Sequence, residues 1–145
     1  MIITIDTGIL VRATSRSKGP ARRLVSAIAS DPHHTLALSP FIIAEVGKAL
    51  SHPRLNRLLG FTSDEIAEHV SYLRSICRLI DPPQGLPIVL TDPADDPIVY
   101  TAVAAGAHAL CTRDRAFYAP SVTAFCRRYA IEVMDEVQLL TKLRS

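Results

Sequence analysis

Six acidic residues have the types and positions expected of a metal-binding site. They are Asp6, Glu45 and four aspartates in or beside the stretch TDPADDPIVYTAVAAGAHALCTRD, namely Asp92, Asp95, Asp96 and Asp114. Carboxylates gathered at one point repel one another, and a hard divalent cation such as Mg²⁺, which prefers oxygen ligands, relieves that repulsion. A metal held in this way activates water and stabilises charge on a phosphoryl group, and two metals can bracket the attacking and leaving oxygens. The pattern therefore indicates metal-dependent phosphodiester hydrolysis, and the lack of a His- or Cys-rich cluster argues against zinc.

The elements predicted around these acids place them at one edge of a sheet. Asp6 follows a short apolar strand at 2–5, and Asp114 follows another at 108–112. Glu45 lies in the helix that Ser39 and Pro40 should start, at the flank of its apolar face. In parallel sheets covered by helices, ligands bind outside the carboxyl ends of the strands. We therefore expect the acids to converge there.

Short apolar strands alternate with helices along the whole chain. Further strands are expected at 34–38, 78–80 and 131–134, and helices at 9–13, 20–30, 40–50, 53–59, 62–76, 95–105, 120–129 and from 135 onward. Thr62 and Glu65 fit a capping box, and Gly106 fits the residue just past a helix end. This alternation predicts an α/β fold, a three-layer α/β/α sandwich around a parallel sheet of four to five strands.

The composition is that of one globular domain, 1–145. Hydrophobic residues make up 48% of the chain, and the formal charge of +2 with a pI near 8.6 permits nucleic-acid binding without demanding it. Cys77, Cys111 and Cys126 form no metal-ligand pattern and are expected to be buried, reduced thiols. We find neither a signal peptide nor an apolar run of the roughly 18 residues that a membrane span needs, so a cytoplasmic protein is expected.

Three stretches of the chain resemble PIN-domain proteins, most of all the VapC-type toxins and the related putative toxin components of bacterial toxin–antitoxin pairs. They are IDTGILVRA, SPFIIAEVGKAL and DPADDPIVYTAVAAGAHALCTRD. Each motif alone is moderately specific, whereas their order and spacing together are strong. The similarity extends over essentially the whole chain and implies a PIN-like fold.

The resemblance also implies a site and an activity. The family's acidic set maps onto Asp6, Glu45, Asp95 and Asp114, with Asp95 preferred over Asp96 by counting back from the AAGA turn. Assisting positions would be Asp92, Asp96, Thr7 and Thr112. The implied activity is Mg²⁺- or Mn²⁺-dependent cleavage of RNA by an endoribonuclease. The implied partners are a small antitoxin protein and a second copy of the chain in a homodimer.

Each acid also has an ordinary structural explanation. Asp6 could cap the following helix, Glu45 could be a solvated helix residue, and Asp95 and Asp96 could be first-turn acids favoured by the helix dipole. Asp114 could be a turn residue or a partner of a neighbouring arginine.

The basic residues leave two interpretations open. Arg113 and Arg115 flank Asp114 and could bind phosphate or lie on the surface. A basic stretch near the first helices could be a solvated face or a contact for RNA or antitoxin; it contains Arg12, Arg16, Lys18, Arg22 and Arg23.

Two other functions compete with the nuclease. One is a catalytically silent PIN-like module that binds RNA or protein, against which the full acidic set weighs. The other is an acidic phosphotransfer protein. A phosphatase of the DxD type needs an aspartate where Gly8 stands, and a receiver domain needs a paired acid before the end of the first strand.

Overall fold

The computed structural model describes residues 1–82 and 96–144. Its centre is a five-stranded, all-parallel sheet in the order β3-β2-β1-β4-β5. The strands are β1 (Ile2–Ile5), β2 (Thr35–Leu38), β3 (Cys77–Leu79), β4 (Ala109–Cys111) and β5 (Glu132–Met134). Because every strand runs the same way, all five carboxyl ends lie along one edge. The predicted parallel sheet is confirmed, with the larger of the two expected strand numbers.

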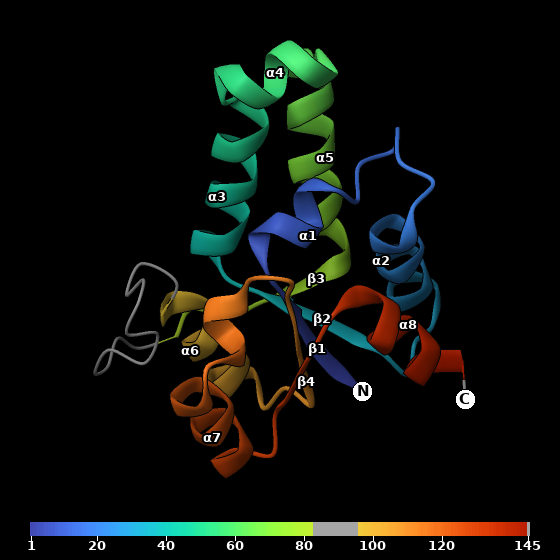
Figure 1. The fold of residues 1–145 in the computed structure, drawn as a ribbon. Coiled ribbons are helices and arrows are strands. Elements are labelled where there is room, and N and C mark those ends of the chain that lie inside the picture. Colours follow the sequence, from blue (N-terminus) through green and yellow to red (C-terminus); the bar gives the residue numbers. More distant parts are fainter. Residues whose placement is uncertain (83–95, 145) are drawn as a thin grey trace.

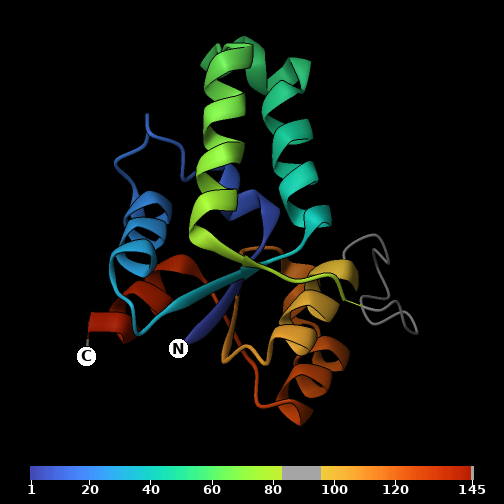
Figure 2. The ribbon, with the colours of Figure 1, turned by 180° about the vertical axis from the view of Figure 1, so that it is seen from behind.

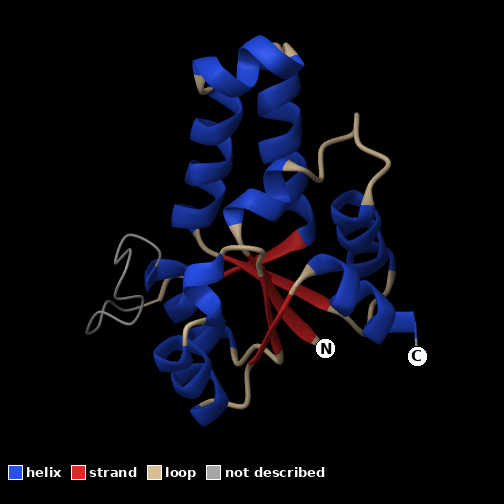
Figure 3. Ribbon diagram, viewed as in Figure 1, coloured by secondary structure: helices blue, strands red, loops and turns tan. Residues whose placement is uncertain are grey.

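Helices cover both faces of this sheet (Figures 1 and 3). They are α1 (Thr7–Val11), α2 (Pro20–Ser30), α3 (Pro40–Ser51), α4 (Pro53–Leu59), α5 (Ser63–Ile76), α6 (Asp96–Ala105), α7 (Pro120–Arg128) and α8 (Glu136–Arg144), with a 3₁₀ turn η2 (Arg115–Tyr118). Helices α2 and α8 pack together on one side and α6 and α7 lie on the other, while the hairpin α3–α5 projects beyond the sheet (Figure 2). The expected three-layer α/β/α arrangement is confirmed.

Local capping signals set the helix starts that the sequence predicts. The Ser39 hydroxyl accepts a hydrogen bond from the Ile42 N–H, and Pro40 occupies the first turn of α3. Thr62 and Glu65 form both hydrogen bonds of a capping box at α5. Each bond satisfies a backbone N–H that the helix itself leaves without a partner. These short-range interactions explain why the helix boundaries could be predicted closely.

The first helix begins earlier than predicted. It starts at Thr7 rather than Ile9, because the Asp6 carbonyl accepts hydrogen bonds from the N–H groups of Ile9 and Leu10. The chain therefore enters a helix directly after β1, without an intervening turn. As a result, Asp6 is held rigidly between a strand and a helix.

The central strands and α6 supply the middle of the core. Ile3 and Ile5 of β1 are fully buried, as are Leu36 and Leu38 of β2. Helix α6 buries one face against the sheet, namely Ile98, Thr101, Ala102 and Ala105. Gly106 follows with a φ of 66°, the left-handed conformation that suits glycine at a helix end. Helix α6 is thus fixed against β1 and β2, with its first turn at the carboxyl edge of the sheet.

Arg16, part of the predicted basic stretch, has a structural role. Its guanidinium donates to both Glu65 carboxylate oxygens, at 2.7 and 2.5 Å, and to the Leu59 and Gly60 carbonyls. It also lies over the Phe61 ring, 4.6 Å from the centroid. The loop after α1 is therefore attached to the start of α5. In 1–82 and 96–144, no helix combines the length and apolar character needed to cross a membrane.

Candidate functional site

Asp6 stands at the centre of the carboxyl edge, directly after β1. Its backbone N–H donates to the Cys111 carbonyl of the neighbouring strand at 2.8 Å, and the residue is only 9% exposed. Although Asp6 occupies the N-cap position of α1, its side chain makes no capping hydrogen bond. Helix capping therefore does not account for this carboxylate, which remains directed at the site.

Thr112 connects Asp6 with Asp114. Its hydroxyl donates to Asp6 Oδ2 at 2.7 Å and accepts from the Asp114 backbone N–H at 3.0 Å. Because the hydroxyl has a single hydrogen, these two bonds fix its orientation. The fully buried Thr112 thus sets where one acid points and where the backbone of the other lies. The resemblance implied Thr112 as an assisting position, and the structure places its hydroxyl against Asp6.

The surroundings of Asp6 act on its pKa in opposite directions. Burial raises its pKa above the ordinary value, the Thr112 hydroxyl and the Thr7 N–H lower it, the Asp114 charge raises it, and the Arg12 charge lowers it. The net result is a raised pKa, because desolvation penalises the charged carboxylate most. The carboxylates of Asp6 and Asp114 are close enough to repel each other. A cation bound between them would remove that repulsion.

Asp114 has one structural role and one exposed face. Its Oδ1 accepts from the Ala116 N–H at 3.0 Å and caps η2, as expected of a turn residue. No salt bridge joins Asp114 to Arg113 or Arg115 in the described part of the chain. Arg113 instead pairs with Glu136. Asp114 itself is exposed, so its carboxylate is accessible to a ligand.

Glu45 lies in the second turn of α3, the helix that follows β2. Its side chain is 38% exposed and forms a 3.4 Å ion pair with Lys48. No hydrogen bond or ion pair joins Glu45 to Asp6 or Asp114 in the described structure. Glu45 therefore lies beyond the carboxyl edge of the sheet, on a helix packed against α1 and α6. The structure does not bring its carboxylate against the other two.

The acids of the third quarter are only partly described. Asp92 and Asp95 lie outside the described residues. Asp96 is in the first turn of α6 and is 7% exposed, which is unusual for an aspartate in a first turn. Helix α6 runs back across the sheet to β4, so its first turn lies at the same edge as Asp6. Asp96, expected only to assist, is therefore buried at the same edge of the sheet as Asp6.

A second set of charges borders the acids. Glu136, the first residue of α8 and 3% exposed, accepts from Arg113 Nε at 2.6 Å and lies 3.8 Å from an Arg12 terminal nitrogen. Sequence reasoning did not include Glu136 or its neighbour Asp135 among the candidates. The signal was available, because Asp135 and Glu136 directly follow β5, as Asp6 follows β1. Burial raises the pKa of nearby Tyr118 to about 12, helped by the charges of Asp135 and Glu136.

The donor chemistry at this edge fits Mg²⁺ or Mn²⁺. The Thr112 hydroxyl bonds to Asp6, the Asp114 charge acts on it, and the buried Thr7 hydroxyl oxygen has no hydrogen-bond partner among the described residues. All three cysteines are free. In the two described ranges, no group of three or more His, Cys, Asp and Glu side chains is arranged to hold a metal. A complete ligand set would therefore need a further acid beyond Asp6 and Asp114.

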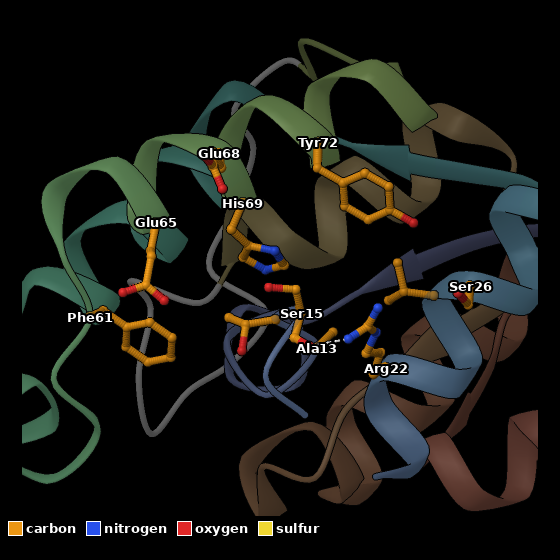
Figure 4. A pocket seen from close by; sticks show the side chains of 11 residues that line it. Ala13, Ser15, Arg22, Ser26, Phe61, Glu65, Glu68, His69 and Tyr72 are labelled. Carbon is orange, nitrogen blue, oxygen red and sulfur yellow. Dashed lines mark hydrogen bonds between the residues drawn. The ribbon is translucent and has the colours of Figure 1, made fainter. Parts of the chain in front are cut away.

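A pocket lies apart from the acids, between the loop after α1, α2 and α5. Figure 4 shows the His69 ring from α5 and the Arg22 guanidinium from α2 on opposite walls. The His69 Nε2 lies 2.9 Å from the Leu10 carbonyl, which can only accept, so Nε2 carries the hydrogen. Burial lowers the pKa of His69. This histidine therefore connects α5 to α1 as a neutral donor.

Comparisons with known proteins agree with this fold. Residues 3–116 match the family model for the PIN domain. A chain of the crystal structure of VapBC2 from Rickettsia felis, bound to a DNA fragment from their promoter, superimposes with a TM-score of 0.57 at 17% identity. The superposition covers 92% of this chain and 98% of that chain, which shows a shared fold. Curated proteins gave no match.

Proposed function

Because the chain belongs to the PIN-domain family, we propose that residues 1–145 form one nuclease domain that hydrolyses RNA phosphodiester bonds with a divalent metal. The observation that carries this proposal is the contact of Thr112 with both Asp6 and Asp114. It holds the Asp6 carboxylate and the backbone of Asp114 at the carboxyl edge of a parallel sheet, where such folds bind ligands. Acids placed in this way would form the start of a metal site.

The metal ligands in this proposal are Asp6, Glu45, Asp95 and Asp114, with Asp92, Asp96, Thr7 and Thr112 assisting. Bound Mg²⁺ or Mn²⁺ supplies a Lewis acid and a water of lowered pKa. The chain's own residues orient the site. Thr112 fixes the Asp6 oxygen by a charge-assisted hydrogen bond, and burial excludes bulk water from that side. To reach the metal, Glu45 would have to give up its ion pair with Lys48. Its side chain is 38% exposed and is therefore free to rotate.

We further propose that the protein is the toxin of a type II toxin–antitoxin pair. The likeness to a VapBC2 chain and the motifs of the sequence support this assignment. The partner would then be a small antitoxin protein, with a homodimer of the nuclease in the cytoplasm. The pairing is tested first by looking for a small reading frame directly upstream of the gene. The protein that it encodes is then co-expressed with this chain, and one chain is affinity-purified. Recovery of this chain alone would argue against the pairing.

The test of the activity uses single carboxylate-to-amide substitutions. Asp6→Asn and Asp114→Asn should each reduce RNA cleavage in Mn²⁺ or Mg²⁺ buffer by at least about a hundredfold, because each removes charge that the metal requires. Asp64→Asn, at an exposed first-turn aspartate of α5, is the matched control and should retain full activity. If Asp6→Asn cleaves RNA as fast as the unaltered protein, the proposal fails.

One observation favours the second candidate, a PIN-like module that binds RNA or protein without cleaving. In the described part of the chain the acids do not complete a three-residue cluster, and Glu45 pairs with Lys48. Calorimetric titration with Mn²⁺ distinguishes the two functions. Binding at or below millimolar concentrations supports the nuclease, whereas no binding together with intact RNA affinity supports the silent module.

A further inference from the structure

Glu136 is a buried carboxylate with incomplete pairing. Its side chain is 4% exposed, and Oε1 accepts the 2.6 Å hydrogen bond from Arg113. Its Oε2 is buried and has no hydrogen-bond partner among the described residues. A carboxylate removed from water is costly unless cations compensate it, and removing one partner of such a pair is strongly destabilising. Glu136 therefore depends on the arginines around it.

Two arginines provide the compensation, and both remain half exposed. The Arg113 side chain is 49% exposed and the Arg12 side chain 51%, with Arg12 3.8 Å from the same Glu136 oxygen. They come from the end of β4 and from the residue after α1, which are distant in sequence. The hydrogen bond to Glu136 uses Nε of Arg113, and in the described structure its two terminal amino groups make no hydrogen bond. One carboxylate thus holds two guanidiniums that keep donors directed to solvent.

This group of charges adjoins the proposed site. In sequence, Arg113 stands between Thr112, which bonds to Asp6, and Asp114. Arg12 is close enough for its charge to act on Asp6. The group of Glu136, Arg12 and Arg113 carries a net charge of +1 next to a cluster of carboxylates. A nuclease needs such positive charge, because its acids would otherwise repel the phosphates of the substrate.

We propose that Glu136 is a positioning residue that holds Arg12 and Arg113 as a pair of backbone-phosphate contacts for single-stranded RNA beside the acidic site. The choice of RNA rests on the proposed function. Guanidinium groups bind phosphate through paired, charge-assisted hydrogen bonds, and pre-orientation by a buried carboxylate reduces the entropy lost on binding. Glu136 is not assigned to the metal, because the charges of Arg12 and Arg113 already lie against Oε1 of the same carboxylate.

The arginines are tested by RNA binding without cleavage. The probe is a fluorescein-labelled 20-nucleotide RNA of random sequence in EDTA buffer, followed by anisotropy across a salt series. Arg12→Ala and Arg113→Ala should each weaken binding by about tenfold and reduce the slope of log K against log salt by about 0.7, the value for one contact with single-stranded phosphate. Arg128→Ala removes an exposed arginine at the end of α7 and is the matched control.

Glu136→Gln tests the proposal by whether RNA affinity rises or falls. Removing a negative charge near RNA strengthens binding if the residue acts only through its charge. If Glu136 positions the arginines, the same substitution weakens binding by several-fold and adds nothing in an Arg12→Ala, Arg113→Ala background. Glu132→Gln is the control, since Glu132 is exposed and pairs with Lys142 at 2.9 Å. Arg113→Lys should not restore affinity, because an ammonium lacks the Nε donor and the planar geometry.

The outcomes separate this inference from the proposed function. If the unaltered protein cleaves RNA but Arg12→Ala and Arg113→Ala bind the probe as tightly as it does, the inference is wrong and the nuclease stands. If no cleavage occurs with Mn²⁺ but binding depends on both arginines, the nuclease is wrong and the inference stands. Loss of Mn²⁺ binding in Glu136→Gln would make Glu136 a metal ligand and overturn its positioning role. Should Glu136→Gln or Arg113→Ala fail to fold in thermal unfolding, Arg12→Ala still decides, because Arg12 lies 3.8 Å from Glu136 and Arg113 keeps its hydrogen bond to that carboxylate.

Discussion

The Thr112 hydroxyl donates a 2.7 Å hydrogen bond to Asp6, a residue 106 positions earlier in the chain. The contact joins the ends of two adjacent parallel strands, β1 and β4. It also orders Asp114, whose N–H donates to the same hydroxyl at 3.0 Å. The geometry of the two acids therefore depends on one buried hydroxyl group.

Thr112→Val should impair both stability and activity. Valine keeps the shape but leaves the Asp6 oxygen and the Asp114 N–H without their partner. We expect the free energy of unfolding to fall by about 1–3 kcal/mol, and RNA cleavage to fall by about tenfold or more as Asp6 loses its orientation. Denaturant titration and initial cleavage rates measure the two effects. Thr112→Ser keeps the hydroxyl and should lie close to the unaltered protein; equal losses in both variants would contradict a role for the hydrogen bond.

Measurements of activity and stability together show which of Asp95 and Asp96 is the metal ligand. The sequence motifs favour Asp95 as the metal ligand, while Asp96 has the buried position at the start of α6. We expect Asp95→Asn to abolish RNA cleavage and leave the melting temperature nearly unchanged. Asp96→Asn should lower the melting temperature and reduce cleavage less. The reverse pattern in cleavage would transfer the catalytic assignment to Asp96.

His69 should make folding sensitive to mild acid. Burial lowers the pKa of His69 in the folded protein, whereas the unfolded chain protonates this residue near its ordinary value of about 6.5. Below that pH the unfolded state binds the additional proton, so stability is lost as the pH falls through about 6.5 toward the lower folded value. The loss is at most about 1.4 kcal/mol per pH unit.

The substitution His69→Gln removes this titration while keeping a donor for the Leu10 carbonyl. The difference in free energy of unfolding between mildly alkaline and mildly acidic buffer should therefore be smaller in His69→Gln. His33→Gln, at a side chain that is 89% exposed, is the matched control. An unchanged pH dependence in His69→Gln would show that another group is responsible.

Ala130→Gly should stabilise the protein. Ala130 follows α7 with a φ of 58°, a left-handed conformation that costs an alanine about 1 kcal/mol relative to glycine. The Ile131 N–H then bonds to the Cys126 carbonyl at 2.9 Å, closing the helix end. We expect a gain of about 0.5–1 kcal/mol in chemical denaturation. Ala124→Gly, at an exposed position inside α7, should instead lose about 1 kcal/mol.

Local signals made most of the fold predictable from the sequence. Helix starts are capped by Ser39 and by Thr62 with Glu65, which bond to backbone N–H groups a few residues away, and Gly106 ends α6. Because these interactions are short-range, the residues can be recognised in the linear sequence. The parallel sheet followed from the alternation of strands and helices. The positions of Asp6 and Asp114 then followed from the rule that parallel strands end at a common edge.

The charge pairs of the site could not be predicted in the same way. Arg113 has a neighbouring acid, Asp114, yet pairs with Glu136, 23 positions later. This pairing depends on β4 and β5 lying side by side, and the order of strands in a sheet is not encoded in the period of hydrophobic residues. The burial of Glu136 and Asp96 is equally invisible to spacing, because it depends on which helices cover each end.

The central position of β1 has a consequence for synthesis. Strand β1 is flanked by β2 on one side and by β4 on the other, so its second neighbour is synthesised about a hundred residues after it. Until Thr112 has left the ribosome, Asp6 lacks the hydroxyl that orients it, and Asp114 does not yet exist. A nascent chain that ends before Thr112 therefore carries Asp6 without the group that orients it. In a protein proposed to cleave RNA, the site can form only after β4 has been synthesised.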